Sequence, residues 1–415
     1  MSLFLSFFLW CIYYPLLTFL KYLFIWHPKV QERIEFEGKN GKDLGSKSWH
    51  EMGLKADLCF EFSSEGEFQQ VASLIYDALK KGKRLELVFF SPSVEKTIID
   101  LARNFSTQVR YLRFPLFNES FSSWVTSDQL ILVRYDLFPE LLSFAMESDK
   151  HLQLLWMTFK KERSKGRTPS WMKRQFLKLA SAIVYASEDD LLYGKKMGFP
   201  GINYDFRMEQ IYRRIKNRGE TLQKKMACFP TYQELLLNYP AHRRLIVGNA
   251  WAEDISLLRN LPQDILLFVV PHQLQEANLD QIAKYLREVG RIPEIISEST
   301  RQLPAGNTFI VNQKGILCEL YSDFGRAYVG GGLGVSVHSI LEPLIAGSEM
   351  ISCGPNHHRS TEYDVARSFG KMTQVQNAPE FEEWLNRAAP QEDSRVKLEA
   401  VIGLYPEYSK GVLKC

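Results

Sequence analysis

Short apolar runs alternate with amphipathic stretches along most of the chain after residue 50. Five runs in the first half have the length and composition of buried strands: LCFEF (58–62), LELVFF (85–90), QLILV (129–133), LQLLW (152–156) and SAIVYA (181–186). After the first run, apolar residues recur at helical spacing: Phe68, Val71, Ala72, Ile75 and Leu79. This order of strand and helix predicts a parallel sheet that is covered by helices.

A second series of the same kind begins near residue 245. Its strands are predicted at LIVGNA (245–250), ILLFVV (265–270), FIV (309–311), AYVGG (327–331) and EMISC (349–353). Helices are expected at 273–288, 314–321, 338–347, 357–369, 378–388 and 395–403. Two series of strand–helix units predict an α/β fold with two Rossmann-like domains, residues 31–212 and residues 213–415.

The N-terminal residues form a separate apolar segment. Residues 2–20 (SLFLSFFLWCIYYPLLTFL) carry no charge, and as a helix they would span roughly 28 Å, about the thickness of a bilayer core. Lys21 and Lys29 follow, so the positive-inside rule keeps the rest of the chain in the cytoplasm. We expect residues 1–30 to anchor the protein to the cytoplasmic side of the inner membrane. Because Pro15 interrupts the run, the segment either spans the bilayer or lies in one leaflet.

Composition and charge exclude some classes of protein. The 415 residues are 45% hydrophobic and 24% charged, which is typical of a globular protein of about two domains. A net charge of +3 argues against a dedicated nucleic-acid binder. The six cysteines have no metal-ligand spacing, and no paired carboxylates are placed to hold a metal-bound diphosphate. We therefore expect neither a metal nor another cofactor.

Basic residues cluster at the join between the two predicted domains, with Glu220 as the only acid among them. They are Arg213, Arg214, Lys216, Arg218, Lys224 and Lys225. One interpretation is a solvated helix face, which charged residues commonly form. The other is a surface that contacts anionic lipid headgroups or a phosphorylated lipid.

A glycine-rich turn is the sharpest functional pattern. The stretch YVGGGLGVSVHSILEP (328–343) reads as a strand that ends in three glycines, followed by a helix that begins near His338 and Ser339. Glycines allow a phosphate to approach the backbone, and a helix N-terminus offers it unpaired N–H groups. Glu342, in the first turn, could then accept hydrogen bonds from ribose hydroxyls. The alternative is a tight turn with a purely structural role.

A second candidate site follows the first predicted strand. In FSSEGEF (62–68), Ser63 or Ser64 can cap the next helix, and Glu65 and Glu67 lie in its first turn. Capping alone can explain these acids. A carboxylate at the end of a strand can also serve as a general base, which is the functional alternative for Glu67.

Several motifs resemble those of the Kdo transferases, which move 3-deoxy-D-manno-octulosonic acid from CMP-Kdo to a lipid A precursor. SSEGEF resembles the motif that carries the catalytic base, here Glu67. VRYDLF resembles a motif whose acid stabilises the transition state, here Asp136. YDFRME resembles a motif with a basic transition-state residue, here Arg207. FFSPS (89–93) and GNAWAED (248–254) are also similar to family motifs.

The resemblance also implies a set of CMP-binding residues. VPHQ (270–273) is similar to a motif that contacts the nucleotide, NQKGI (312–316) matches a loop that touches it, and SILE (339–342) matches the motif that grips it. The residues carried over are Pro271, His272, Lys314, Gly315, Ile316, Ser339, Ile340, Leu341 and Glu342.

The reaction that the resemblance implies is a single displacement with inversion at the anomeric carbon. Glu67 would take the proton of the acceptor hydroxyl, while Arg207, His272 and the helix start near Ser339 would stabilise the charge on the departing CMP phosphate. The expected partners are the CMP-Kdo donor, a lipid A precursor as acceptor and the membrane lipid. The resemblance implies a GT-B type fold of two Rossmann-like domains.

Two other functions stay open at this stage. One is a membrane-associated enzyme of the same two-domain build that uses a UDP-sugar. The other is a degenerate homologue that binds a lipid or a partner enzyme, because Asp136 is shorter than the family's glutamate and Ser339 replaces an asparagine.

Overall fold

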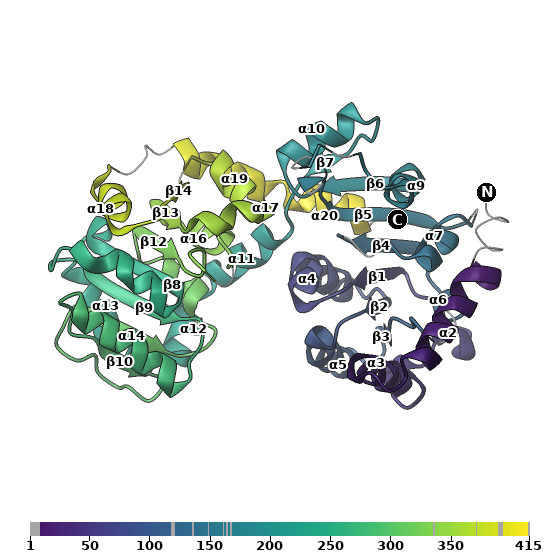
Figure 1. Cartoon of the computed structure of the whole chain (residues 1–415), viewed down its shortest axis with the longest axis horizontal. Helices are drawn as coiled ribbons and strands as arrows, with labels where there is room; N and C mark the ends of the chain where they lie inside the picture. The colour runs from purple at the N-terminus through teal and green to yellow at the C-terminus, as the bar shows by residue number, and fades with distance from the viewer. Residues whose placement is uncertain are drawn as a thin grey trace. The chain divides into compact units, whose positions relative to one another are not determined.

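The chain divides into two compact units, each built on its own parallel sheet (Figure 1). The computed structural model describes residues 9–117, 121–134, 137–147, 149–160, 162, 165–166, 168–334, 337–370, 372–388 and 393–413. The first unit consists of Met1–Arg207 and Tyr405–Cys415, and the second of Met208–Leu404.

The sheet of the first unit has seven strands in the order β3-β2-β1-β4-β5-β6-β7. Their bounds are β1 (Leu58–Phe62), β2 (Leu85–Phe89), β3 (Val109–Arg113), β4 (Gln129–Val133), β5 (His151–Met157), β6 (Ala180–Tyr185) and β7 (Ile202–Asn203). The described α-helices after β1 are α4 (Glu65–Lys80), α5 (Glu95–Asn104), α6 (Phe121–Trp124), α7 (Pro139–Ala145), α9 (Trp171–Leu179) and α10 (Glu188–Lys196). A 3-10 turn, η5 (Pro92–Val94), precedes α5.

Burial explains why the apolar runs become strands. All five residues of β1 and of β2 are buried, as expected for a parallel sheet covered on both faces. The helical pattern predicted after β1 is confirmed in α4, since Phe68, Val71, Ala72, Ile75 and Leu79 are all buried. These side chains therefore fix the helix that begins at the carboxyl end of β1.

The N-terminal segment is helical but is divided into short pieces. It forms a π-helical turn (Leu9–Tyr13), α2 (Tyr14–Leu23) and α3 (Pro28–Gly38), followed by the 3-10 turns η2 (Lys39–Gly41), η3 (Leu44–Ser46) and η4 (Trp49–Met52). Pro15 lies in the first turn of α2, a position where proline's missing N–H costs nothing. In the part of the chain that the structure describes, no helix has both the length and the apolar character needed to cross a bilayer.

The second unit repeats the architecture with the strand order β10-β11-β9-β8-β12-β13-β14. Its strands are β8 (Arg244–Ala250), β9 (Leu266–Pro271), β10 (Glu294–Ser297), β11 (Thr308–Asn312), β12 (Arg326–Val329), β13 (Met350–Cys353) and β14 (Met372–Gln374). Its helices are α11 (Arg207–Lys216), α12 (Arg218–Lys225), α13 (Phe229–Leu237), α14 (Glu276–Glu288), α15 (Leu317–Tyr321), α16 (Leu341–Ala346), α17 (Thr361–Ser368), α18 (Ala378–Asn386) and α19 (Asp393–Gly403). Shorter turns are η6 (Ala241–Arg243), η7 (Ala252–Asn260) and η8 (Pro355–Arg359).

The last helix, α20 (Tyr405–Leu413), belongs to the first unit, whereas the sequence pattern places residues up to 415 in the second domain. In Figure 1 this yellow helix lies beside the teal strand β5. The Tyr405 hydroxyl donates to Asp77 (2.7 Å), and Gln153 donates to the carbonyl of Val412 (3.2 Å). Because Tyr405, Val412 and Leu413 are buried, the segment returns to cover apolar surface of the first unit.

Each sheet has a central point where the strand order reverses. In the first unit this point lies between β1 and β4, and in the second between β8 and β12. Open α/β sheets bind ligands at the carboxyl ends of the strands beside such a point. The loops that follow β1, β4, β8 and β12 are therefore where a site is expected.

Candidate functional site

The glycine turn of the second unit is held by a buried acid from the loop after β8. Asp254 is 1% exposed, and it accepts hydrogen bonds from the amides of Gly331 (3.0 Å) and Trp251 (2.9 Å) and from the Tyr328 hydroxyl (3.0 Å). A Cβ atom at Gly330 would lie 2.5 Å from the Asp254 carboxylate. This acid therefore fixes the path of the chain as it leaves β12.

A buried histidine packs against the other side of the turn. A Cβ atom at Gly332 would lie 2.2 Å from Nδ1 of His357, and Nε2 of the same ring accepts from the amide of His338 (3.4 Å). Gly330 and Gly332 are thus both required by packing. The structural explanation of these glycines is sufficient by itself, so a ligand role for the turn depends on the residues around it.

Three aromatic rings from three loops stack next to the turn. Trp251, after β8, stacks on His272, after β9, with ring centroids 5.1 Å apart and planes 26° apart. His272 in turn lies 4.3 Å from the ring of His338, whose Nε2 accepts from the Trp251 indole (3.4 Å). This ring stack joins the carboxyl ends of β8, β9 and β12 at the point where the strand order reverses.

Burial shifts the imidazoles of the ring stack toward their uncharged form. Burial, reinforced by His272 and His357, lowers the pKa of His338 to about 4. Burial also lowers the pKa of His272. His272 would therefore contact a phosphate as a hydrogen-bond donor.

The helix after the turn begins later than the sequence predicts, and its first amides are occupied. α16 starts at Leu341, and the carboxylate of Glu362 accepts from the amides of Ile340 (2.9 Å) and Leu341 (3.4 Å). The side chains of Ile340 and Leu341 are fully buried. The expectation of unpaired amides for a phosphate is thus wrong for these two residues, because an acid of α17 already satisfies them.

Glu342 lies in the first turn of α16, as predicted, and faces an arginine. Its carboxylate is 3.7 Å from Arg214 of α11, whose guanidinium also pairs with both oxygens of Glu319 at 3.0 Å. The side chain of Glu342 is 22% exposed. Burial, together with Glu362 and Glu319, raises the pKa of Glu342 to about 7 against the opposing effect of Arg214.

The basic residues of 213–225 have partners inside the second unit. Arg214 pairs with Glu319, Arg218 with Asp323 (2.7 Å) and Arg213 with Glu209 (2.7 Å). The remaining contacts are Lys216 over the Tyr212 ring, Lys224 with Glu220, and Lys225 with the carbonyl of Gly315. These pairs favour the structural interpretation of the basic cluster.

The other predicted nucleotide contacts follow β9 and β11. Pro271 is the buried last residue of β9, and His272 comes directly after it. Lys314 and Gly315 are exposed, whereas Ile316 is fully buried and can offer a ligand only its backbone. The structure therefore brings the predicted CMP residues to the carboxyl ends of β9, β11 and β12.

In the first unit, Glu67 supports the start of α4. It is 6% exposed, and one carboxylate oxygen accepts from the amide of Ser63 (2.6 Å). The side chain of Ser64, the residue before the helix, makes no capping hydrogen bond. The capping interpretation of Glu67 thus has a direct observation behind it, and the same contact orients the carboxylate at the carboxyl end of β1.

Glu65, the other acid of this turn, is engaged by neighbouring side chains. It accepts from Gln69 (2.7 Å) and from Thr97 (2.8 Å). The backbone beside it is tied to the FFSPS motif, since the amide of Ser91 donates to the carbonyl of Ser63 (2.7 Å). The motifs that follow β1 and β2 therefore lie side by side.

Arg207 ends the first unit and is paired with Asp205. Two guanidinium nitrogens bond the carboxylate at 2.9 and 2.5 Å, and Asp205 is 2% exposed. The guanidinium also lies 4.7 Å from the ring centroid of Trp156. Asp136, the predicted transition-state acid, lies outside the described residues.

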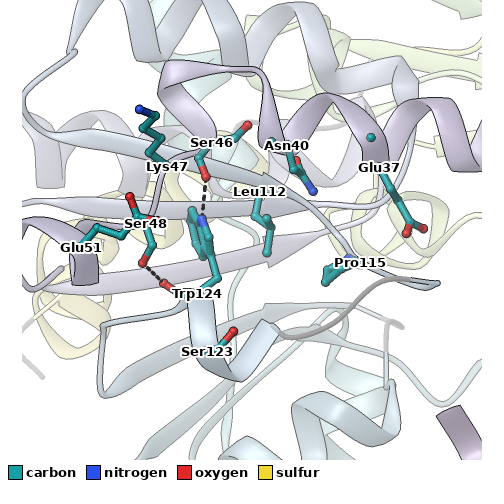
Figure 2. A pocket seen from close by; sticks show the side chains of 12 residues that line it. Glu37, Asn40, Ser46, Lys47, Ser48, Glu51, Leu112, Pro115, Ser123 and Trp124 are labelled. Carbon is teal, nitrogen blue, oxygen red and sulfur yellow. Dashed lines mark hydrogen bonds between the residues drawn. The ribbon is translucent and has the colours of Figure 1, made fainter.

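A pocket of about 520 Å³ lies elsewhere in the first unit (Figure 2). Trp124 forms part of its lining, donating its indole N–H to the carbonyl of Ser46 (2.8 Å) and accepting from Ser48 (2.6 Å). Glu37, also in the lining, accepts from the amides of Leu116 and Phe117 at 3.0 Å. None of the predicted site residues is among its described lining residues.

Known proteins resemble this chain in fold but not in sequence. No family model and no curated protein matches it. A UDP-GlcNAc 2-epimerase from Neisseria meningitidis, solved with UDP-GlcNAc, aligns over 86% of this chain and 94% of its own, with 12% identity and a TM-score of 0.51. The two share a fold. That fold is of the GT-B type, two α/β units each built on a parallel sheet.

Two further solved structures are similar at lower scores. The C-terminal CMP-Kdo-binding domain of WaaA from Acinetobacter baumannii aligns over 48% of this chain and 94% of its own, with 18% identity and a TM-score of 0.29. MurG from the same organism aligns over 83% and 99%, with 10% identity and a TM-score of 0.46. Identities this low describe fold alone and leave the substrate to be argued from the residues.

Sequence reasoning missed three residues of these sites. Trp251 lies inside the GNAWAED motif, but nothing in its spacing showed that it would stack on His272. Arg214 was grouped with surface charges, because its pairing with Glu319 and Glu342 depends on tertiary packing. Trp156 was predicted only as an apolar residue of a strand, since its backbone conformation is not visible in the sequence.

Proposed function

We propose that the protein is an inverting glycosyltransferase that moves Kdo from CMP-Kdo to a lipid A precursor at the cytoplasmic side of the inner membrane. The observation that carries this proposal is the ring stack beside the glycine turn. It gathers His272, His338 and Trp251 at the carboxyl ends of β8, β9 and β12, where a nucleotide would bind in this fold. Glu342, in the first turn of α16, is then the acceptor for ribose hydroxyls.

The first unit supplies the base in this proposal. Glu67 is nearly buried, and its contact with the Ser63 amide leaves the carboxylate oriented at the end of β1. As the acceptor hydroxyl attacks the anomeric carbon, Glu67 takes its proton. The bond from that carbon to the CMP phosphate breaks, and its electron pair leaves with the phosphate. One displacement of this kind inverts the configuration.

Charge on the departing phosphate is stabilised by cationic side chains and by hydrogen-bond donors. Burial lowers the pKa of His272, so this side chain would act as a donor, and the amides of Ile340 and Leu341 already donate to Glu362. Among the residues that the resemblance assigns, Arg207 and Lys314 supply the positive charge in this proposal.

The membrane part of the proposal rests on residues 12–26, which include α2. Their large apolar side chains are exposed to solvent: Ile12, Leu16, Phe19, Tyr22, Leu23, Phe24, Ile25 and Trp26. A contiguous apolar surface of this kind is typical of a helix that lies in a membrane interface, with Lys21 at the headgroups. Deleting residues 2–26 should release most of the protein from membranes. A truncated protein that stayed membrane-bound at high salt would overturn this assignment.

The reaction is tested by incubating purified protein with CMP-Kdo and a lipid A precursor and following both products by mass spectrometry. The proposal requires the acceptor to gain the mass of one or more Kdo residues, with stoichiometric release of CMP. Transfer from a UDP-sugar instead would overturn the CMP-Kdo proposal and identify a UDP-sugar transferase of the same two-domain build. Absence of transfer from either donor would favour a binding role.

A further inference from the structure

Three side chains of the first unit meet near the carboxyl edge of its sheet. Arg134 directly follows β4, Trp156 is next to the last residue of β5, and Arg207 begins α11. The guanidinium carbons of Arg134 and Arg207 each lie 4.7 Å from the ring centroid of Trp156. The guanidinium carbons of Arg134 and Arg207 are therefore separated by no more than twice 4.7 Å. We call these three residues the Arg–Trp–Arg cluster.

The backbone of the cluster is in an unusual conformation. Arg134 has φ 74° and Trp156 has φ 60°, so two of the three described non-glycine residues with positive φ belong to it. The amide of Arg134 donates to the carbonyl of Leu155 (2.9 Å), and the pairing of β5 with β6 shifts register between Leu154 and Met157. Strained residues and strand irregularities gather at binding sites, where they direct side chains that a regular strand would turn elsewhere.

Trp156 contains a buried donor that lacks an acceptor. The residue is 5% exposed, and its indole N–H has no hydrogen-bond partner among the described residues. Buried donors are normally satisfied, and an indole nitrogen can only donate. The missing partner must therefore be an acceptor, and the two guanidinium groups over the same ring favour one that is negatively charged.

Arg207 is held in place by Asp205, which is buried and bonds two of its guanidinium nitrogens. Guanidinium groups present several N–H donors in one plane, which matches the oxygens of a phosphate or a carboxylate.

We propose that the Arg–Trp–Arg cluster binds an anionic oxygen group, a phosphate or a carboxylate, through Arg134, Trp156 and Arg207. The site lies beside the reversal point between β1 and β4, so it adds Arg134 and Trp156 to the residues that contact substrate. It rests on the geometry of the first unit alone and not on the identity of the donor. The anion belongs either to the nucleotide donor or to a phosphorylated acceptor.

The full-length protein offers a matched control for this proposal. Arg110 also lies over an indole ring, that of Trp49, at 5.6 Å, and like Arg134 it is partly exposed. If stacking on tryptophan were the whole role of Arg134, then replacing either arginine with glutamine should have the same effect on ligand binding.

The test is a titration with inorganic phosphate at constant ionic strength, followed by calorimetry and by the melting temperature. The wild-type protein and Arg110→Gln should bind phosphate saturably. The phosphate affinity of Arg134→Gln should be lower by about tenfold or more. Trp156→Phe keeps an aromatic ring but removes the N–H donor, so the phosphate affinity of this variant should fall several-fold. Arg134→Lys keeps the charge and should lie between wild type and Arg134→Gln.

The same titration repeated with saturating CMP identifies the source of the anion. Competition assigns it to the nucleotide donor, and independent binding assigns it to the acceptor. Equal phosphate affinity in wild type, Arg134→Gln and Trp156→Phe would overturn the proposal and leave the cluster a structural stack. Should Arg134→Gln fail to fold, Trp156→Phe carries the test. Since no step requires turnover, failure here is distinct from failure of the proposed reaction.

Discussion

Each unit of the molecule places a glutamate in the first turn of a helix that follows a strand at the reversal point. Glu67 follows β1 and its carboxylate accepts the amide of Ser63, only four residues away. Glu342 follows β12 and faces Arg214 of α11 and, through it, Glu319. A first-turn glutamate is thus a backbone-bound acid in one unit and a member of a charge network in the other.

This difference shows that a first-turn acid cannot be assigned a role from its position alone. The Ser63 contact is local, because this amide lies just before α4 and only four residues from Glu67. The contacts of Glu342 depend on elements distant in the sequence. The proposed function gives Glu67 proton transfer and Glu342 nucleotide recognition, and each role can be tested separately.

The largest effect is expected for Glu67→Ala. Removing a general base should lower the rate of sugar transfer by about 10²–10⁴-fold. Initial rates of CMP release with donor and acceptor present measure it. Glu65→Ala is the matched control, since this neighbouring acid is engaged by Gln69 and Thr97 and should change the rate only a few-fold. Near-normal transfer by Glu67→Ala would reduce Glu67 to a helix cap.

A smaller effect, on stability, is expected for Asp254→Ala in the second unit. The change leaves the Tyr328 hydroxyl and the amides of Trp251 and Gly331 without their acceptor, which should cost about 3 kcal/mol of unfolding free energy. Denaturant unfolding measures this cost. Asp264→Ala, at an exposed ion pair with Arg243, should change stability by less than about 1 kcal/mol. If the two variants were equally stable, Asp254 would not be what holds the glycine turn.

The smallest of these effects concerns the pH dependence of stability. Burial raises the pKa of Glu342 to about 7, above the value of about 4.3 expected in an unfolded chain. The folded state thus binds this proton more tightly, and the resulting stabilisation is complete below about pH 4 and is lost as the pH rises through 7. Glutamine mimics the protonated acid.

Glu342→Gln should therefore be more stable than wild type at pH 8, by about 1–3 kcal/mol, and similar to it near pH 4. Unfolding curves of both proteins at the two pH values measure the difference. A glutamine variant that is less stable than wild type at pH 8 would mean that the Arg214 pair is a net structural contact.

The fold was largely predictable because a buried parallel strand leaves a strong apolar signal. Five strands of the first sheet and five of the second coincide with the predicted runs to within two residues at either end. Four strands were missed. Charged residues interrupt the apolar pattern of β3 (VRYLR) and β10 (EIIS), and β7 (IN) and β14 (MTQ) are too short to leave a pattern. The return of α20 to the first unit depends on long-range burial, which no local pattern records.

The candidate site was predictable only in part. The motifs placed Glu67, His272 and Glu342 at strand ends, because motif spacing reflects the order of strands and loops. The lowered pKa of His272 and the Glu362 contact at α16 could not be predicted, since both depend on burial and on side chains far away in the sequence. The positive φ of Trp156 likewise follows from pairing within the sheet.

The most direct test of the two assignments is a calorimetric titration of CMP into wild type, Glu67→Ala, Glu342→Gln and Glu349→Gln at pH 8. Glu349 precedes β13, at the edge of the sheet away from the nucleotide loops, and serves as the control. We expect Glu67→Ala and Glu349→Gln to bind CMP as wild type does. The CMP affinity of Glu342→Gln should be lower by about tenfold or more. Equal affinity in all four proteins would contradict the account, as would a loss confined to Glu67→Ala.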